Sequence, residues 1–266
     1  MTTTHTDTTA EGHYSLDNTW EHARRRLGLI EATYDAGSLR RLAALGVGPG
    51  WQCLEVGGGG GSIARWLCSR VGRTGRVVAV DIETRFLEEI GADNLEVARL
   101  DVTTSGLPKD AFDLIHARAV LAHLPARDAV LSALVAALRP GGWLLLEEPD
   151  EYGNAVLGTG THGEAFTRIN LAMRRAGFDP QWARTLPERF AANGLRDIGV
   201  NSELTVAEGG SPEAELIRLT SVQLRPLTLE VGATPELLDE WDGLLRTPGR
   251  WFPCFALVSV WGRRAG

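Results

Sequence analysis

Apolar residues recur along the chain with two different periods, and the two periods alternate. Over residues 18–45 they recur at helical spacing and Gly46 follows as a stop, while the stretch Tyr34–Gly37 predicts a break into two helices. Downstream, short apolar or β-branched runs predict strands. The expected strands are 51–56, 76–80, 95–100, 112–116 and 143–146, and the expected helices are 63–70, 84–90 and 126–138. Such alternation is typical of βαβ units and a parallel sheet, with strands buried on both faces.

Beyond residue 151 the rhythm changes. Helical spacing predicts helices over 164–177, 182–193, 212–224 and 235–245, and strand-like runs occupy 198–206 and 254–261. Two late strands separated by a helical excursion favour an antiparallel pair at the sheet edge, with the excursion forming part of a lid. The glycine-rich stretch 153–163 is expected to be a mobile loop of that lid.

The strongest chemical signal is a run of five glycines, Gly57–Gly61, between the first strand and the helix after it. Glycine permits positive φ and a close approach of a ligand to the backbone, and the next helix offers unpaired N–H groups to an anion. With Glu55 before it, the run fits the pattern acidic-x-Gly-x-Gly-x-Gly. A dinucleotide frame, Gly-x-Gly-x-x-Ala over residues 59–64, also fits, but it places two extra glycines between strand and turn.

Together with the motifs that follow it, this loop resembles the class I S-adenosylmethionine-dependent methyltransferases of the small-molecule type. The resemblance covers roughly residues 51–148 and extends more loosely to 261. Asp81 ends the second strand in VVAVD, Asp101 ends the third in ARLDV, and LRPGGW over 138–143 precedes the fifth. The resemblance implies an α/β, Rossmann-like, mostly parallel seven-stranded sheet with helices on both faces and an α-helical cap. It also implies S-adenosyl-L-methionine as cofactor and S-adenosyl-L-homocysteine as product.

The resemblance further implies which residues contact the cofactor. In that family the glycine loop surrounds the methionine half, the acid after the second strand bridges the ribose hydroxyls, and the acid after the third strand holds the adenine with its apolar neighbour. A carboxylate such as Asp81 can accept from both hydroxyls, although it could equally cap the helix expected at 84–90. Glu55 either contacts the cofactor's ammonium or holds the glycine loop. The expected cofactor residues are Glu55, Gly57, Gly58, Gly59, Gly61, Asp81, Ile82, Asp101, Val102 and Arg118.

The segment after the fourth strand should face the reaction centre, because ligands bind at the carboxyl ends of strands in such sheets. His123 in this segment is the candidate catalytic base, with a pKa suited to neutral pH; the alternative is a histidine that stacks on the cofactor or fills space. His116 is expected to point into the sheet. Aromatic residues outside the core could line an apolar acceptor pocket or pack a core. The expected substrate residues are Tyr14, Trp20, Tyr152 and Trp182.

Composition narrows the picture by exclusion. The net charge is −7, which argues against a nucleic-acid partner and against docking on an anionic membrane. No apolar run reaches the roughly 20 residues that span a bilayer, and the N-terminus lacks the features of a signal peptide, so a cytoplasmic location is expected. The three cysteines show no metal-ligand spacing, and no metal is expected.

These features predict a methyltransferase that uses S-adenosylmethionine and acts on a small, largely apolar metabolite, in secondary metabolism, with O-, N- and C-methylation left open. One alternative is a cyclase or decarboxylase with the same fold and cofactor. Another is an NAD-dependent oxidoreductase, although its Tyr-x-x-x-Lys is missing, since Ser105 stands four residues before Lys109, the sole lysine. The expected partner is a small molecule, and a homodimer is left open.

The expected organisation is a flexible tail over 1–15 and a single methyltransferase domain over 16–266. Within that domain, residues 16–48 are expected to form N-terminal cap helices and residues 49–150 the cofactor-binding core. Residues 151–266 are expected to supply the substrate and cap segments and the C-terminal strands.

Overall fold

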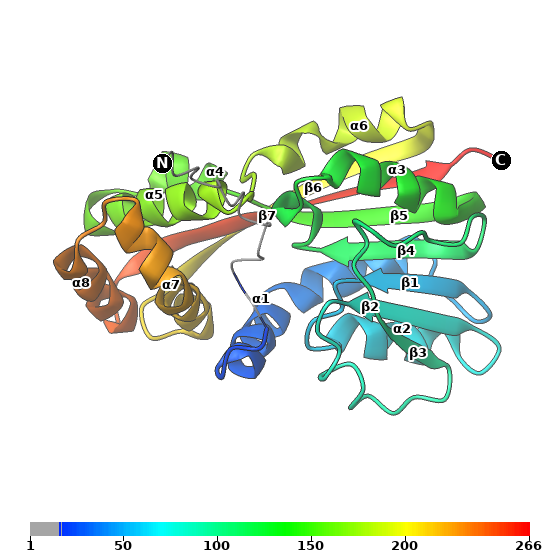
Figure 1. Ribbon diagram of the computed structural model, residues 1–266, viewed down its shortest axis with the longest axis horizontal. Coiled ribbons are helices and arrows are strands. Elements are labelled where there is room, and N and C mark those ends of the chain that lie inside the picture. The colour runs from blue at the N-terminus through cyan, green and yellow to red at the C-terminus, as the bar shows by residue number, and fades with distance from the viewer. Residues whose placement is uncertain (1–15, 17) are drawn as a thin grey trace, which may run out of the picture.

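The computed structural model describes residue 16 and residues 18–266, so the expected tail at 1–15 and the candidate substrate residue Tyr14 lie outside the described residues. Seven strands form one sheet in the order β3-β2-β1-β4-β5-β7-β6 (Figure 1). All neighbouring pairs from β3 to β5 are parallel, and β7 is antiparallel to both β5 and β6. The strands are β1 Gln52–Val56, β2 Arg76–Asp81, β3 Leu95–Arg99, β4 Phe112–Arg118, β5 Leu138–Asp150, β6 Leu195–Glu208 and β7 Trp251–Arg264.

Helices cover both faces of the sheet and extend past one end of it. Figure 1 shows α1 and α2 on one face and α3 and α6 on the other, while α4, α5, α7 and α8 lie beyond the carboxyl ends of the parallel strands. We call those four helices the cap. The helices are α1 Ala23–Ala44, α2 Ser62–Val71, α3 Arg127–Ala137, α4 Tyr152–Leu157, α5 Gly160–Arg175, α6 Leu186–Ala192, α7 Pro212–Glu230 and α8 Pro235–Arg246. The predicted mostly parallel α/β sheet with a helical cap and a late antiparallel pair is confirmed.

Two of the predicted breaks in the helices are wrong. The N-terminal segment forms one continuous helix, α1, which passes through the expected break at Tyr34–Gly37. Gly37 and Ser38 are buried in its middle. A Cβ atom at position 37 would meet only the ends of the flexible Arg41 and Glu203 side chains, at 2.7 and 2.8 Å. Burial of this stretch, rather than its local sequence, accounts for the continuous helix. Similarly, the stretch expected to be a mobile loop contains helix α4 and the start of α5 at Gly160.

The segment after β2 also differs from expectation. Residues 84–90 form successive turns rather than a helix. Backbone bonds run from the N–H groups of Leu87 and Glu88 to the Thr84 carbonyl oxygen, without continuing into an α-helical ladder. Phe86 and Leu87 nevertheless bury their side chains, which explains the helix-like apolar spacing. Asp81 therefore cannot be explained as the cap of a helix over this stretch.

A buried ionic network crosses the middle of the sheet. His116 on β4 contacts Glu55 on β1 through Nδ1 (2.7 Å) and Glu147 on β5 through Nε2 (3.2 Å). Ser259 on β7 donates to Glu147 Oε1 at 2.7 Å, and Ser38 on α1 donates to Glu147 Oε2. All five side chains are buried. The network therefore ties α1 to four strands of the sheet.

The two carboxylates keep His116 protonated. Burial alone would lower the pKa of His116, but Glu55 and Glu147 raise it to about 9. Burial likewise opposes ionisation of Glu147, yet hydrogen bonds from His116, Ser38 and Ser259 hold its pKa at about 2. The imidazolium faces two carboxylates, and the Arg41 guanidinium adds a second positive charge, with its Nε 3.5 Å from Glu147 Oε1. Removing His116 would leave buried carboxylate charge uncompensated.

This network predicts a stability loss at alkaline pH. The pKa of His116 rises from 6.5 to about 9 on folding, so its contribution is complete below pH 6.5 and disappears as the pH rises through about 9. We expect the free energy of unfolding to fall by about 3 kcal/mol across this window. Urea titrations at successive pH values measure it. The difference between wild type and His116→Gln should carry this pH dependence, whereas His22→Gln, at an exposed histidine, should follow wild type. A wild-type profile that is flat over the window would contradict the assignment.

Candidate functional site

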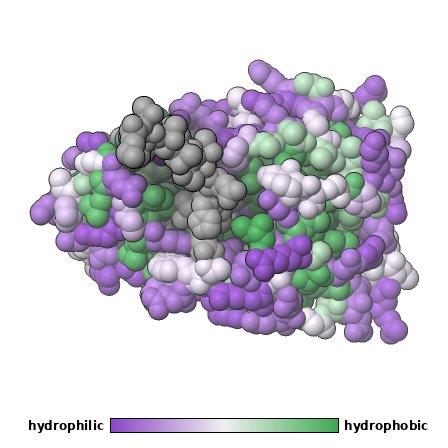
Figure 2. Space-filling model, viewed as in Figure 1, coloured by the Kyte–Doolittle hydropathy of each residue, from purple (hydrophilic) through white to green (hydrophobic). Residues whose placement is uncertain are grey.

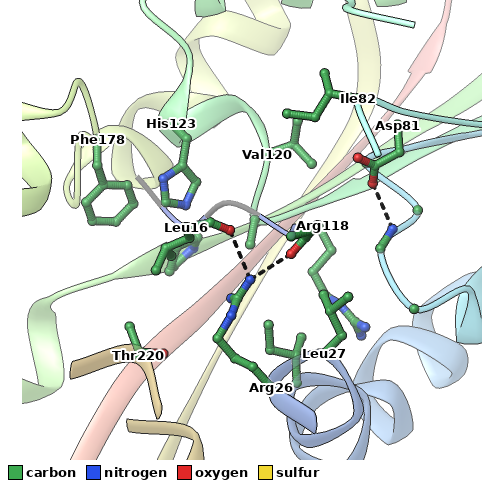
Figure 3. A pocket seen from close by; sticks show the side chains of 18 of the residues that line it. Leu16, Arg26, Leu27, Asp81, Ile82, Arg118, Val120, His123, Phe178 and Thr220 are labelled. Carbon is green, nitrogen blue, oxygen red and sulfur yellow. Dashed lines mark hydrogen bonds between the residues drawn. The ribbon is translucent and has the colours of Figure 1, made fainter. Parts of the chain in front are cut away.

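A single cavity of about 780 Å³ lies between the carboxyl ends of the parallel strands and the cap. Its walls come from α1, from the loops after β1, β2, β3 and β4, and from α5, α7, α8 and β7. Figure 3 shows Asp81 and Ile82 at one side, His123 and Phe178 at the other, and Arg118 between them. We call these two sides the loop half and the cap half. The face in Figure 2 exposes hydrophobic residues near its middle, while hydrophilic residues predominate along its outline.

The glycine loop forms the floor of the loop half. Gly57, Gly59 and Gly61 all have positive φ, at 67°, 53° and 89°. A Cβ atom at Gly57 would lie 2.3 Å from the Val120 side chain, so a larger residue would also collide with the turn after β4. The loop ends at the N-terminus of α2. Four of the five glycines, Gly57 to Gly60, line the cavity, whereas Gly61 is the buried N-cap residue of α2.

Asp81 is fixed at the end of β2 and is almost fully buried. Its Oδ2 accepts from the Gly59 N–H at 2.9 Å (Figure 3). Its Oδ1 accepts from the Glu83 N–H at 3.0 Å. Burial raises the pKa of Asp81, against the effect of these backbone donors. A carboxylate oxygen has two lone pairs, so each oxygen can accept one further hydrogen bond from a ligand. The geometry suits a pair of neighbouring hydroxyl groups.

Asp101, Val102 and Ile82 line the same half of the cavity. Asp101 Oδ1 accepts from the Thr103 N–H at 2.8 Å and from the Thr103 hydroxyl at 2.6 Å, which sets the carboxylate in the turn after β3. Neither bond uses Oδ2. Ile82 is 47% exposed, although it follows a buried strand. An apolar side chain and a carboxylate oxygen can together receive a flat base that carries an amino group.

Arg118 ends β4 and bridges the loop half to α1. It donates to Asp35 Oδ1 at 2.9 Å and to Ser38 Oγ at 3.0 Å, so its charge is paired. The next residue, Ala119, has a positive φ of 55° and donates its N–H to the Glu147 carbonyl at 2.7 Å. A non-glycine residue in this conformation stores strain, and such strain concentrates at functional sites.

Glu55 lines the cavity, but its carboxylate is engaged with His116 beneath the glycine loop. Of the two roles expected for Glu55, this contact favours holding the base of the loop. His116 is fully buried in the sheet, as expected, and does not line the cavity.

His123, the candidate catalytic residue, lines the cap half of the cavity. Its ring stacks on Phe178 with the centroids 4.6 Å apart (Figure 3). The expectation of a pKa near neutrality is wrong, because burial and then the charges of Arg26 and Arg127 lower the pKa of His123 to about 3. The imidazole is therefore neutral at physiological pH and offers an acceptor nitrogen rather than a charge.

The rest of the cap half is mainly apolar. Residues from α5, α7, α8 and β7 supply aliphatic and aromatic side chains to it: Phe166, Ile169, Met173, Leu216, Ile217, Trp241, Phe255 and Leu257. Thr220 also points toward it from α7 (Figure 3). Walls of this kind bind the apolar body of a small molecule.

The expected substrate residues that the structure describes lie elsewhere. Trp182 is 2% exposed and belongs to the main core, Trp20 packs beside Phe86, and Tyr152 is 57% exposed at the start of α4. None of the three lines the cavity. Their positions give no support to the expected acceptor contacts. Aromatic character alone did not distinguish a core position from a cavity wall.

Several cavity residues were not expected from the sequence. Helix α1 contributes Leu27, Glu31 and Tyr34, together with Arg26, which donates to Asn18 Oδ1 at 2.9 Å (Figure 3). The available signal was the helical spacing of α1, with Leu27 and Tyr34 seven residues apart on one face. That spacing predicts a packed face, without saying whether protein or ligand covers it.

Two absences bear on the chemistry of the part of the chain that the structure describes. Among residue 16 and residues 18–266, no group of three or more His, Cys, Asp or Glu side chains is arranged to hold a metal ion. Within the same described part of the chain, no helix combines the length and apolarity needed to cross a membrane.

The residues present fit an adenosyl cofactor. The loop half joins a glycine loop at a helix N-terminus to two carboxylates, Asp81 and Asp101, at the ends of neighbouring strands β2 and β3. This spacing offers donors to an amino-acid carboxylate and acceptors to a ribose diol and to an amino group on a base.

Comparison with known proteins places the chain among methyltransferases. Residues 18–199 match the family described as methyltransferase domain. A ubiquinone/menaquinone biosynthesis C-methyltransferase, UbiE, from Ectopseudomonas mendocina is 30% identical over 179 residues, which cover 60% of this chain and 70% of that protein. The protein of the same name from Laribacter hongkongensis is 35% identical over 114 residues, which cover 40% of this chain and 46% of that protein.

Solved structures share the fold. A phosphoethanolamine N-methyltransferase 2 from Haemonchus contortus, in complex with S-adenosyl-L-methionine, aligns with a TM-score of 0.61 at 17% identity and covers 97% of this chain and 60% of that one. The YcgJ protein from Bacillus subtilis aligns with a TM-score of 0.56 at 16% identity and covers 91% of this chain and 98% of that one. The chain belongs to the methyltransferase domain family and is a class I S-adenosylmethionine-dependent methyltransferase.

Proposed function

We propose that this enzyme transfers a methyl group from S-adenosylmethionine to a small, largely apolar metabolite bound in the cap half of the cavity. The observation that carries the proposal is the division of one cavity into two chemically different halves. The loop half presents carboxylates and backbone groups, and the cap half presents mainly aliphatic and aromatic walls. A polar cofactor and an apolar acceptor would thus meet inside one enclosure of about 780 Å³. A product of secondary metabolism suits such walls.

We assign the cofactor contacts residue by residue. The loop of Gly57, Gly58 and Gly59, closed by Gly61 at the start of α2, would hold the methionine half. Asp81 would accept from the ribose hydroxyls, beside Ile82. Asp101 and Val102 would hold the adenine. Arg118 would support the cofactor site by fixing α1 through its ion pair with Asp35. Glu55 would do so by fixing the glycine loop through its contact with His116.

The bound cofactor supplies a methyl carbon that is already activated by its positive sulfur. The protein's part is therefore mainly to align the acceptor atom with that carbon and to exclude water. Cap residues such as Phe166 and Met173 shield the cavity from solvent, and the turn at Val120 holds the glycine loop against β4. Alignment of this kind can supply a large part of the rate enhancement.

We propose that His123 orients the acceptor. Its ring is fixed by stacking on Phe178, and its neutral imidazole can accept a hydrogen bond from an acceptor O–H or N–H. A low pKa makes His123 a weak base at rest. His123 would therefore take the proton of an O–H or N–H acceptor only during methyl transfer, when the acceptor gains positive charge and the sulfur loses it.

The related proteins support the reaction and leave the acceptor atom open. UbiE is named as a C-methyltransferase, and the Haemonchus enzyme is named as an N-methyltransferase. The identity to UbiE reaches 30% over 60% of this chain, which supports methyl transfer to a small molecule without fixing the acceptor.

Product analysis tests the proposed function directly. We expect the purified protein, supplied with S-adenosylmethionine and a panel of apolar aromatic phenols and amines, to release S-adenosylhomocysteine. At least one acceptor should gain the mass of one methylene group. Mass spectrometry should find this methylated product and S-adenosylhomocysteine in equal amounts. Sugar phosphates of similar size serve as the control panel and should not react, because the cap half is mainly apolar. A converted acceptor with unchanged mass would instead indicate a cyclase-type reaction and contradict methyl transfer.

The role of His123 predicts a separate result. His123→Ala should reduce kcat for methyl transfer by about 100-fold, the lower end of what a positioned proton acceptor contributes. His123→Phe is the matched control, since it keeps a ring against Phe178 but removes the acceptor nitrogen. Both variants should keep the wild-type affinity for S-adenosylhomocysteine. Recovery of activity in the Phe variant would show that the ring only fills space.

A further inference from the structure

Helix α7 places one carboxylate in the cap half of the cavity. Glu213 lies in the first turn of α7 and lines the cavity together with Leu216, Ile217 and Thr220. Leu216, Ile217 and Thr220 lie three, four and seven residues after Glu213, so the four residues share one face of the helix. Glu213 is partly buried on that face. A negative charge therefore stands at the edge of a mainly apolar wall.

The other acidic side chains of the cavity are engaged, and Glu213 is not. Within residue 16 and residues 18–266, the side chain of Glu213 makes no hydrogen bond or ion pair. Each of the other acidic residues that line the cavity has a partner on the same chain: Glu31 with the Ser62 N–H, Glu55 with His116, Asp81 with the Gly59 N–H, Glu83 with the Arg85 N–H and Asp101 with Thr103. The Glu213 carboxylate therefore has its acceptor sites open to a ligand in the cavity.

The chain contains an internal comparison for this residue. Helix α8 begins with Thr234-Pro235-Glu236, and α7 begins with Ser211-Pro212-Glu213. In both helices the capping hydroxyl accepts a backbone N–H at 3.2 Å, and a glutamate follows the proline. The helix dipole favours a carboxylate at this position in either helix. Glu236 is exposed, however, whereas Glu213 lines the cavity, so the dipole does not account for where Glu213 points.

The charge of Glu213 contributes to the pKa shifts of two residues in the cavity wall. Burial raises the pKa of the Tyr34 hydroxyl, and Glu213 adds to that increase. Burial and then Glu213 also raise the pKa of the Cys254 thiol, to about 12. Tyr34 on α1 and Cys254 on β7 both line the cavity, as Glu213 does. The neutral His123 adds no positive charge there.

We propose that Glu213 selects an acceptor that carries an ammonium group on an otherwise apolar body. This inference rests on the proposed function, because it names the chemistry of the molecule bound beside the cofactor. The ammonium donates to the Glu213 carboxylate, and the apolar body packs on Leu216, Ile217 and the aromatic residues opposite. Such a charge-assisted hydrogen bond is shorter and stronger than one between neutral groups. Glu213 is thus a specificity residue, and the geometry assigns it no step in methyl transfer.

Binding of three matched probes tests the proposal. Naphthylethylamine, naphthylethanol and naphthylacetate share an apolar body and differ in the charge of the side arm. Calorimetry at neutral pH, on protein saturated with S-adenosylhomocysteine, gives their dissociation constants. We expect wild type to bind the amine about tenfold more tightly than the alcohol and the acetate least. Glu213→Gln should bind amine and alcohol equally, whereas Glu236→Gln, the matched change on α8, should keep the wild-type preference.

The outcomes separate this inference from the proposed function. If wild type binds S-adenosylhomocysteine and Glu213→Gln binds it equally, the variant is folded and the cofactor half is intact. Absence of an amine preference in wild type, or its survival in Glu213→Gln, then overturns the role of Glu213 alone. A variant that loses affinity for S-adenosylmethionine but not for S-adenosylhomocysteine would place the carboxylate against the cofactor's positive sulfur, and would also overturn it. Failure of wild type to bind S-adenosylhomocysteine would instead refute the proposed function.

Discussion

The protonated His116 held between Glu55 and Glu147 fixes the geometry on which the rest of the site depends. These three side chains come from three neighbouring strands and share one face of the sheet, where charges are costly unless paired. Ser38 extends the same network to α1 through Glu147 and Arg118. Because α1 also forms one wall of the cavity, a charge buried beneath the sheet surface determines where that wall stands. Mispositioning of α1 would alter both halves of the cavity together.

The charges of the cavity are distributed unevenly, and this unevenness separates the functions of its two halves. In the loop half, carboxylates and backbone groups are held by the chain's own hydrogen bonds, so their remaining acceptor sites are fixed before a ligand arrives. Preorganisation of this kind reduces the cost of binding. In the cap half, His123 is kept neutral by burial and by the charges of Arg26 and Arg127. The side chain of Glu213 adds a carboxylate to this half, which is otherwise mainly apolar.

Local chemistry in the sequence predicted the strands of the sheet, and the structure brings the residues expected at the cofactor together around one half of the cavity. Consecutive apolar positions identify the buried strands such as β1 and β4, whereas β6 at the sheet edge is mostly exposed. The continuity of α1 through Gly37 was missed, since the burial of Gly37 and Ser38 is a tertiary contact that the local sequence does not show. The predictions for residues 84–90 and for the cap wall were wrong for a related reason. An apolar position at helical spacing predicts burial, but tertiary contacts decide whether core or cavity covers it, as Trp182 and Ile217 show.

The most direct test of this account is the affinity for S-adenosylhomocysteine, measured by calorimetry for wild type and for Asp81→Ala. We predict that wild type binds it and does not bind NAD, and that Asp81→Ala weakens binding by about 1–3 kcal/mol through loss of charged hydrogen bonds. Asp93→Ala, at an exposed acid outside the cavity, should bind as wild type does. Binding of NAD in place of S-adenosylhomocysteine, or an unchanged affinity in Asp81→Ala, would contradict the assignment of the loop half.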